Sequence, residues 1–256
     1  MRVKLPGKKE KPLPVSDPVQ HAEKLHGCSF HVLQTVSSWE KDIRKLPERG
    51  SETARWYSTG DFNRLGKGYA RHCGPTAITN LILLLNSRYG FLTGGQDADT
   101  VFYAAAALGK RKMIYWNTDR IPFFGGTNNF LTGMYIRDSL RYFNVPCTWN
   151  PSGAGDDREE KDHADVPAPK RLVVQAALPS KAALLQALRE GKLIFLELMY
   201  HPLYGCHDVL CYGYTTLRCA EDGRRETYLI LADGWSREPR YLRVGDPGMF
   251  CCFMIR

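Results

Sequence analysis

The sequence contains no apolar run of about 18 residues, which is the usual minimum for a membrane-spanning helix. Its first eight residues include the basic Arg2, Lys4 and Lys8, but no apolar segment follows them as it would in a secretory signal. These two absences predict a protein without a membrane span, and we expect a cytoplasmic location for the chain as written.

No Cys-x-x-Cys motif occurs either, so the commonest sequence signature of a structural zinc site is missing. One group of candidate ligands does lie close together in sequence: Cys206, His207, Cys211 and Cys219. Alternation along a strand would place Cys206 and His207 on opposite faces, where the two side chains do not share an ion. We therefore predict no metal site and no other cofactor.

The cysteines do not form a recognisable disulfide framework, although there are eight of them: Cys28, Cys73, Cys147, Cys206, Cys211, Cys219, Cys251 and Cys252. Three of them lie in apolar, strand-like runs, where a free cysteine behaves as a small hydrophobic residue. Without a secretory signal, a reducing compartment and free thiols are the expectation.

The formal net charge is +8, and much of it lies in the first eleven residues. No nucleic-acid-binding motif accompanies this charge, so we predict a solvated, disordered basic tail over residues 1–19 and no nucleic-acid partner. The remaining 20–256 contain enough apolar residues, 43% over the whole chain, for one packed domain.

The sequence pattern divides this domain into two halves. Residues 20–150 are predicted to be mainly helical, and the polar, aperiodic stretch 151–168 is predicted to be a mobile loop. Residues 170–256 are predicted to hold one helix and an antiparallel sheet; the expected helices are 74–85, 99–108, 131–143 and 181–190, and the expected strands are 193–198, 207–214, 227–232, 240–244 and 249–255. The fold class is therefore α+β, with a cleft between the halves.

Cys73 is the leading candidate for a catalytic residue, because it directly precedes a strongly apolar helix. Pro75 and Thr76 suit the first turn of that helix, and a helix so apolar is expected to be buried. Free N–H groups and the positive end of the helix dipole stabilise a thiolate at such a position. We therefore expect the pKa of Cys73 to be lowered.

A cysteine nucleophile needs a base and a group that orients the base, and His207 and Asp233 meet these needs. His207 begins one predicted strand and Asp233 ends the next, so antiparallel pairing brings them to the same end of the sheet. The simpler alternatives are a packing cysteine, a histidine bonded to backbone, and a turn-forming Asp233. His72 is a rival base, while Asp208 is expected to point away from the site as a surface or turn contact.

The segments Cys73-Gly74-Pro75-Thr76-Ala77, His207 before a strand ending in Gly213-Tyr214, and Asp233-Gly234-Trp235 together resemble papain-like cysteine peptidases. The similarity is greatest to the bacterial branch that includes the bacteriocin (double-glycine leader) processing peptidases. This resemblance implies a papain-like fold, a Cys73–His207–Asp233 triad, an acyl-enzyme intermediate and a peptide or protein substrate. It also implies that Gly74 and Trp235 shape the site, with Trp235 shielding the His–Asp pair from water.

One position departs from the family pattern. The family usually has a Gln six residues before the cysteine, whose amide donates to the oxyanion, but Lys67 stands there. Asn63 is the nearest upstream amide and is the candidate to replace it, together with the backbone N–H of Cys73. Three functions remain open from the sequence: a cysteine peptidase, a transglutaminase-like amide-transferring enzyme, and a catalytically inactive binding module of the same fold.

Overall fold

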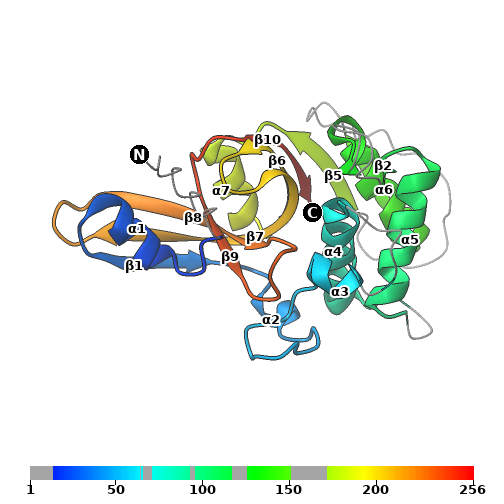
Figure 1. Ribbon diagram of the computed structural model, residues 1–256, viewed down its shortest axis with the longest axis horizontal. Helices are drawn as coiled ribbons and strands as arrows, with labels where there is room; N and C mark the ends of the chain where they lie inside the picture. The colour runs from blue at the N-terminus through cyan, green and yellow to red at the C-terminus, as the bar shows by residue number, and fades with distance from the viewer. Residues whose placement is uncertain (1–13, 64, 66–70, 93–95, 117–125, 151–171) are drawn as a thin grey trace, which may run out of the picture.

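The computed structural model of the protein describes residues 14–63, 65, 71–92, 96–116, 126–150 and 172–256 (Figure 1). The helices are α1 (Pro18–His26), α2 (Glu40–Ile43), α3 (Thr59–Asn63), α4 (Cys73–Tyr89), α5 (Ala98–Arg111), α6 (Thr132–Tyr142) and α7 (Lys181–Arg189), with a short 3-10 helix at Asn129–Leu131. The strands are β1 (Phe30–Val36), β2 (Tyr115–Trp116), β3 (Gly126–Thr127), β4 (Cys147–Asn150), β5 (Leu172–Ala177), β6 (Leu193–His201), β7 (Gly205–Cys219), β8 (Arg225–Ala232), β9 (Arg240–Arg243) and β10 (Met249–Ile255). The predicted α+β class is confirmed at this level.

One large, mostly antiparallel sheet organises the chain, with the strand order β4-β5-β10-β6-β7-β8-β9. Strands β6 to β9 follow one another as an antiparallel meander, as the sequence predicted. The last strand, β10, does not extend this meander but returns to pair with β6 on one side and β5 on the other. The edge strand β4 runs parallel to β5.

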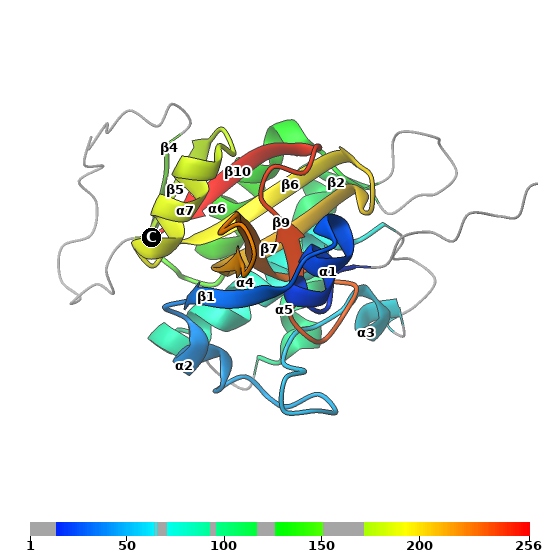
Figure 2. The ribbon, with the colours of Figure 1, turned by 90° about the vertical axis from the view of Figure 1, so that its left-hand side faces the viewer.

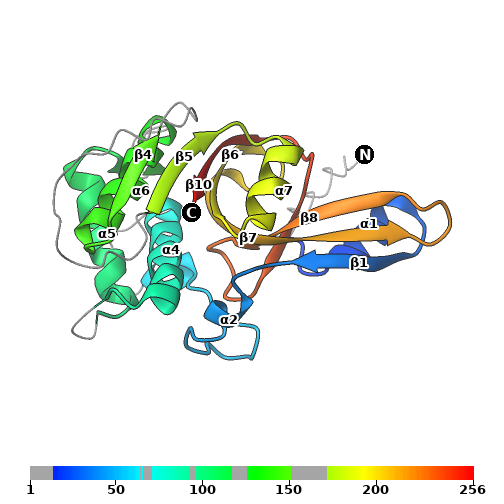
Figure 3. The same cartoon turned by 180° about the vertical axis from the view of Figure 1, so that it is seen from behind.

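Helices cover both faces of this sheet (Figures 1 and 3). Helix α4 packs against β7 on one face and is flanked by α5 and α6, while α7 packs against β6 and β7 on the other. Alternation along β7 separates the two cores: Leu210 belongs to the core under α4, whereas Val209 and Cys211 belong to the core under α7. The side of β7 that a residue faces therefore decides which helix it meets.

The N-terminal part of the chain differs from its prediction. Strand β1 lies within the predicted helical half but pairs with the far end of β7, and Figure 2 views this end of the molecule. Val15 forms a bridge with Tyr241, and α1 begins at Pro18 after the N-cap Asp17. The structured chain therefore starts before residue 20, while residues 1–13 and the whole of the predicted loop 151–168 lie outside the described residues.

The helix ends follow the expected local chemistry. Ser180 accepts a hydrogen bond from the backbone N–H of Ala183 and so caps α7, and the left-handed Gly90 ends α4. Among the described residues, no helix is both long enough and apolar enough to cross a membrane.

Candidate active site around Cys73

Helix α4 carries Cys73 as its first residue, whereas the sequence predicted that the helix begins at Gly74, directly after the cysteine. His72 precedes it with a non-helical backbone, and Pro75 falls in the first turn, where its missing N–H costs nothing. The helix is buried on nearly all sides from Gly74 to Leu85, so its position against β7 is fixed by packing. Cys73 itself is half-buried at the N-terminal end.

The group that lies beside Cys73 is Asp208. The thiol Sγ donates toward Asp208 Oδ2 at 3.7 Å, and Asp208 is only 4% exposed. The prediction of Asp208 as a surface or turn contact is therefore wrong. Asp208 shares the α4 side of β7 with Leu210, whereas its neighbour His207 faces the other way.

Within the described residues, no hydrogen bond joins Cys73 to His207, so the structure does not bring the expected Cys–His pair together. Helix α4 and β7 still place the two residues on adjoining elements. The reason is the period of the strand: two consecutive residues cannot both face the same helix. The residue that meets the thiol is the carboxylate at position 208.

Glu197 of β6 adds a second acid to this place, because it pairs directly with Asp208 across the two strands. It is fully buried and accepts a short hydrogen bond from the Thr132 hydroxyl. Burial first, and then the negative charge of Asp208, hold the pKa of Glu197 well above its ordinary value. Glu197 is therefore protonated at neutral pH, which leaves Asp208 as the charge carrier of the pair.

Glu197 is not among the site residues predicted from the sequence, although the sequence holds a signal for it. It is the one charged residue in the otherwise apolar run Leu193–Leu198. A buried strand accepts a carboxyl group only where a partner satisfies it, so an acid in such a run points to a polar site. The expectation of an ordinary core strand overlooked this.

Gly74 is needed for the shape of the site, as the resemblance implied. A Cβ built at Gly74 would lie 1.9 Å from Thr127 Oγ1 of β3 and 3.0 Å from Asp208 Oδ2. Any larger residue would push β3 or the carboxylate away from the helix end. Glycine therefore permits the close approach of Thr127 and Asp208 to the start of α4.

The electrostatics at Cys73 oppose the expected thiolate. Burial raises the pKa of Cys73 far above its ordinary value, and the charge of Asp208 raises the pKa further. The backbone N–H groups of Asp208 and Gly74 favour the thiolate, but they do not outweigh these two effects. The expected lowering of the pKa of Cys73 is therefore wrong for this arrangement, and the thiol carries its proton.

His207 and Asp233 do meet at one end of the sheet, but through a different atom from the one expected. His207 Nε2 lies 2.6 Å from the backbone oxygen of Asp233. A carbonyl oxygen only accepts, so Nε2 carries the proton and Nδ1 is the basic nitrogen of the neutral ring. Burial lowers the pKa of His207 to about 4.

The carboxylate of Asp233 is used within its own turn. It accepts the backbone N–H groups of Trp235 and Ser236, each at 2.9 Å, and the hydroxyl of Tyr204 at 3.2 Å. This is the turn-forming role that the sequence left as the alternative. The Trp235 ring lies 4.7 Å from the His207 ring, and the Tyr204 ring stacks parallel to His207 at 5.5 Å.

His72 and Asn63 form a separate pair before the helix. His72 Nε2 lies 2.9 Å from Asn63 Oδ1, and its Nδ1 lies 3.3 Å from Thr76 Oγ1. Both ring nitrogens of His72 are therefore engaged away from the thiol. Asn63 sits beside the residue that precedes Cys73, with its amide oxygen already accepting, while Lys67 lies outside the described residues.

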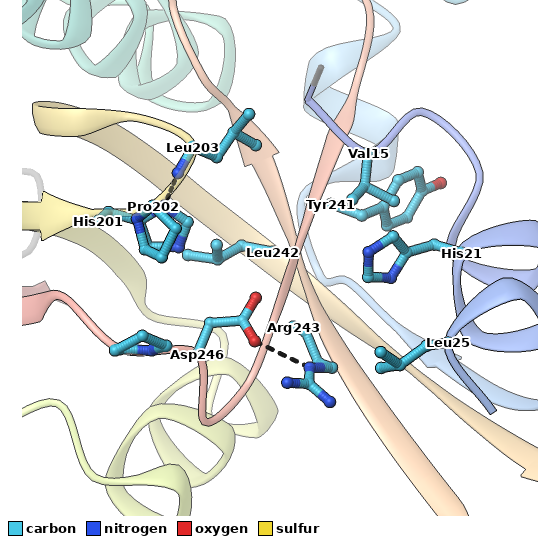
Figure 4. A pocket seen from close by; sticks show the side chains of 11 residues that line it. Val15, His21, Leu25, His201, Pro202, Leu203, Tyr241, Leu242, Arg243 and Asp246 are labelled. Atoms are coloured by element: carbon cyan, nitrogen blue, oxygen red, sulfur yellow. Dashed lines mark hydrogen bonds and ion pairs between the residues drawn. The ribbon is translucent and has the colours of Figure 1, made fainter. Parts of the chain in front are cut away.

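A cavity of about 250 Å³ lies elsewhere, between the loop after β6, strand β9 and helix α1 (Figure 4). Its walls carry two imidazoles, His21 and His201, and the ion pair of Arg243 with Asp246. His201 Nδ1 accepts the backbone N–H groups that follow it, at Leu203 and Tyr204. Neither Cys73 nor Asp208 lines this cavity, so it is not the expected catalytic cleft.

The candidate site is thus a thiol at a helix start facing a buried carboxylate, with an imidazole on the preceding residue of the carboxylate's strand. Such a set contains a nucleophile and two groups that accept protons. Its polar groups come from α4, β6 and β7, which the sheet topology holds together. Comparison of the chain with protein-family models, with curated proteins and with solved structures finds no match.

Proposed function

We propose that this protein is a cysteine hydrolase, specifically a peptidase, with Cys73 as its nucleophile. The observation that carries the proposal is the placement of the Cys73 thiol at the start of a buried helix, 3.7 Å from the Asp208 carboxylate. A thiol in that position has a proton acceptor within reach and backbone N–H groups beside it. The resemblance to papain-like peptidases supports the same choice of nucleophile and a peptide or protein substrate.

Asp208 is proposed as the base in place of His207. Burial raises the pKa of Asp208 above its ordinary range, which makes the carboxylate a stronger proton acceptor than an exposed one. Asp208 Oδ2 takes the thiol proton as Cys73 Sγ attacks the carbonyl carbon of the substrate. Neutral Glu197 stays protonated beside it, so the pair does not hold two negative charges.

The oxyanion that forms is proposed to rest on the backbone N–H of Cys73 and on the amide of Asn63. The Asn63 oxygen accepts from His72, which leaves the Nδ2 group as the donor for the substrate. The proton on Asp208 passes to the leaving amine, and water then hydrolyses the thioester that links the acyl group to Cys73. No metal or cofactor enters this sequence of steps.

The role of His207 distinguishes this proposal from the family pattern. In the described register His207 faces its partners Asp233, Trp235 and Tyr204, and a shift of β7 by one residue would exchange it with Asp208. The triad of Cys73, His207 and Asp233 therefore requires a register that differs from the one described.

The test is covalent labelling with a peptide that carries a thiol-reactive electrophile, followed by peptide mapping and a screen of peptide hydrolysis. Modification is expected at Cys73, and Cys73→Ala is expected to abolish both labelling and hydrolysis. The exposed Cys206 provides the matched control, because Cys206→Ser removes an accessible thiol outside the site. Labelling that survives Cys73→Ala and disappears with Cys206→Ser would rule out the proposal.

An inactive binding module is the second candidate, and the high pKa of Cys73 specifically favours it. Under this alternative the protein binds peptides without turning them over. Equal peptide affinity of the wild type and Cys73→Ala, with no hydrolysis and no covalent labelling by either, would identify such a module.

A further inference from the structure

A pair of cysteines, Cys28 and Cys219, lies where the end of α1, the start of β1 and the last residue of β7 meet, at the opposite end of β7 from Asp208. Figure 2 views the end of the molecule that carries α1 and β1. Cys28 follows the left-handed Gly27 that ends α1, and Cys219 is the last residue of β7. The strand pairing fixes both, since Phe30 lies opposite Cys219 and the N–H of Ala220 donates to the Ser29 oxygen at 2.9 Å.

The two sulfur atoms are 3.0 Å apart. This is shorter than the about 3.5–4.0 Å typical of non-bonded heavy atoms, and about 1 Å longer than a disulfide bond. Two thiolates on one tetrahedral zinc ion, with Zn–S bonds of about 2.3 Å, would have their sulfurs about 3.8 Å apart. The separation of Cys28 and Cys219 lies between the disulfide and zinc-bound values, and it is shorter than both the non-bonded distance and the distance between two zinc-bound sulfurs.

An acid lies beside the pair. Glu221 Oε2 is 3.0 Å from Cys219 Sγ, and the three side chains Cys28, Cys219 and Glu221 place their ligand atoms within 4.8 Å of one another. The carboxylate accepts the Cys219 proton and is the natural place for that proton when the sulfur reacts. Cys28 is more accessible than Cys219, which is 1% exposed.

We propose that Cys28 and Cys219 are a disulfide-forming site that is oxidised by a low-molecular-weight disulfide of the glutathione class. The Cys28 thiolate, whose proton has gone to water, attacks one sulfur of that disulfide, breaks its S–S bond and forms a mixed disulfide; the first small thiolate leaves and takes up a proton from water. Cys219 then gives its proton to Glu221 and attacks the Cys28 sulfur, the mixed disulfide breaks, and the second small thiolate leaves and takes the proton from Glu221. Two protein thiols become one disulfide, and one small disulfide becomes two thiols, so two electrons are transferred in total.

The bond would join the chain after α1 to the turn between β7 and β8. It closes a long loop of the sequence, since Cys28 and Cys219 are separated by most of the domain. Such a cross-link is expected to raise the unfolding midpoint of the oxidised protein relative to the reduced protein. Free thiols, the expectation from the sequence, describe the reduced form.

The test uses the full chain, incubated with oxidised glutathione and mapped by mass spectrometry without reduction. The expected result is a peptide pair joined through Cys28 and Cys219, which separates on adding reductant. Cys28→Ser and Cys219→Ser are each expected to abolish the pair, whereas Cys206→Ser leaves it intact. The map of the wild-type protein needs no variant to fold.

Two results would overturn the proposal. The first is glutathione attached to Cys28 or Cys219 with no bond between them, which would mean that the two sulfurs do not meet. The second is stoichiometric zinc that protects both thiols from oxidation and is lost in Glu221→Gln. That outcome would reassign the three residues as metal ligands.

Discussion

His207 and Asp208 are consecutive residues of β7, yet they lie in different surroundings. Asp208 faces the start of α4 and meets the Cys73 thiol, while His207 faces Trp235 and the backbone of Asp233. Both are buried, and burial moves their pKa values in opposite directions, upward for the acid and downward for the imidazole. Side chains alternate between the two faces of β7, and this alternation decides whether Asp208 or His207 is the proton acceptor available to the nucleophile.

The alternation of side chains between the two faces is interrupted once along β7. The pairing with β8 shifts between Cys211 and Gly213, where a bulge places an extra residue in the strand. Gly213 is required there, because an added Cβ would lie 2.6 Å from the Val36 oxygen of β1. Because of the extra residue, alternation counted from one end of β7 gives the wrong face beyond the bulge. The faces of residues near Cys219 therefore do not predict the faces of His207 and Asp208.

The largest expected effect is on catalysis. We expect Asp208→Asn to reduce peptide hydrolysis by on the order of 10²–10⁴, because it removes the base nearest the thiol. His207→Ala should cost much less, since His207 faces away from Cys73. Steady-state kcat of the two variants, with folding checked by circular dichroism, measures the difference, and a larger loss for His207→Ala would reverse the assignment.

The next largest effect is expected on stability, at Gly74, which lies beside Asp208 on the α4 side of β7. Gly74→Ala is expected to lower the free energy of unfolding by about 1–3 kcal/mol, because the new Cβ overlaps Thr127. Gly60→Ala is the matched control, since its Cβ would meet only Ser58 Oγ at 3.4 Å. Denaturant titration of both variants provides the comparison, and equal losses would show that the contact at Gly74 relaxes freely.

The acid side of the pH–stability curve tests His207. Its folded pKa of about 4 lies below the unfolded value, so the unfolded chain binds the extra proton between about pH 6.5 and pH 4. Stability contributed by neutral His207 is therefore lost as the pH falls through this window, by about 1.4 kcal/mol per pH unit. His207→Gln should flatten that limb in urea unfolding curves, and an unchanged slope would place the ring in water.

The alkaline side tests Glu197 with the opposite sign. Its folded pKa is raised, so the folded protein holds a proton that the unfolded chain loses above about pH 4.3. Stability therefore falls as the pH rises from there toward the folded pKa. Glu197→Gln keeps the neutral shape and should flatten this decline, whereas a decline identical to the wild type would mean that Glu197 is ionised in the fold.

The smallest expected effect is on the free energy of unfolding when the Trp235 ring, which packs against His207, is removed. Trp235→Leu should cost about 0.5–1.5 kcal/mol beyond the lost burial, because it removes the ring contact of Trp235 with His207 and Tyr204. The double variant with His207→Gln should show less than the sum of the two single losses. Additive losses in denaturant titrations would mean that the rings do not interact.

Much of the fold was readable from local patterns. The apolar run after Cys73, the Ser180 cap and the β10 segment predicted their elements closely, because local chemistry decides them. Strand β1 was not readable, because it exists through its pairing with the end of β7 rather than through its own sequence. Tertiary context outweighs local propensity in such a strand.

The candidate site was readable only in part. Cys73 followed from the helix start, the role of Gly74 was implied by the resemblance, and the meeting of His207 with Asp233 followed from the hairpin. The contact of Asp208 with the thiol did not follow, because a sequence gives the alternation of a strand but not which of its two faces meets the helix. The position of Glu197 beside Asp208 did not follow either, because it depends on the register between β6 and β7.

The most direct test of the account is the rate of iodoacetamide modification of Cys73 against pH in the wild type, Asp208→Asn and His207→Ala. The charge of Asp208 raises the pKa of Cys73, so Asp208→Asn should move the profile to lower pH, while His207→Ala leaves it unchanged. Thr76→Ser serves as a conservative control on the same helix. A profile that moves upward in His207→Ala and stays fixed in Asp208→Asn would contradict the account and establish a Cys73–His207 pair.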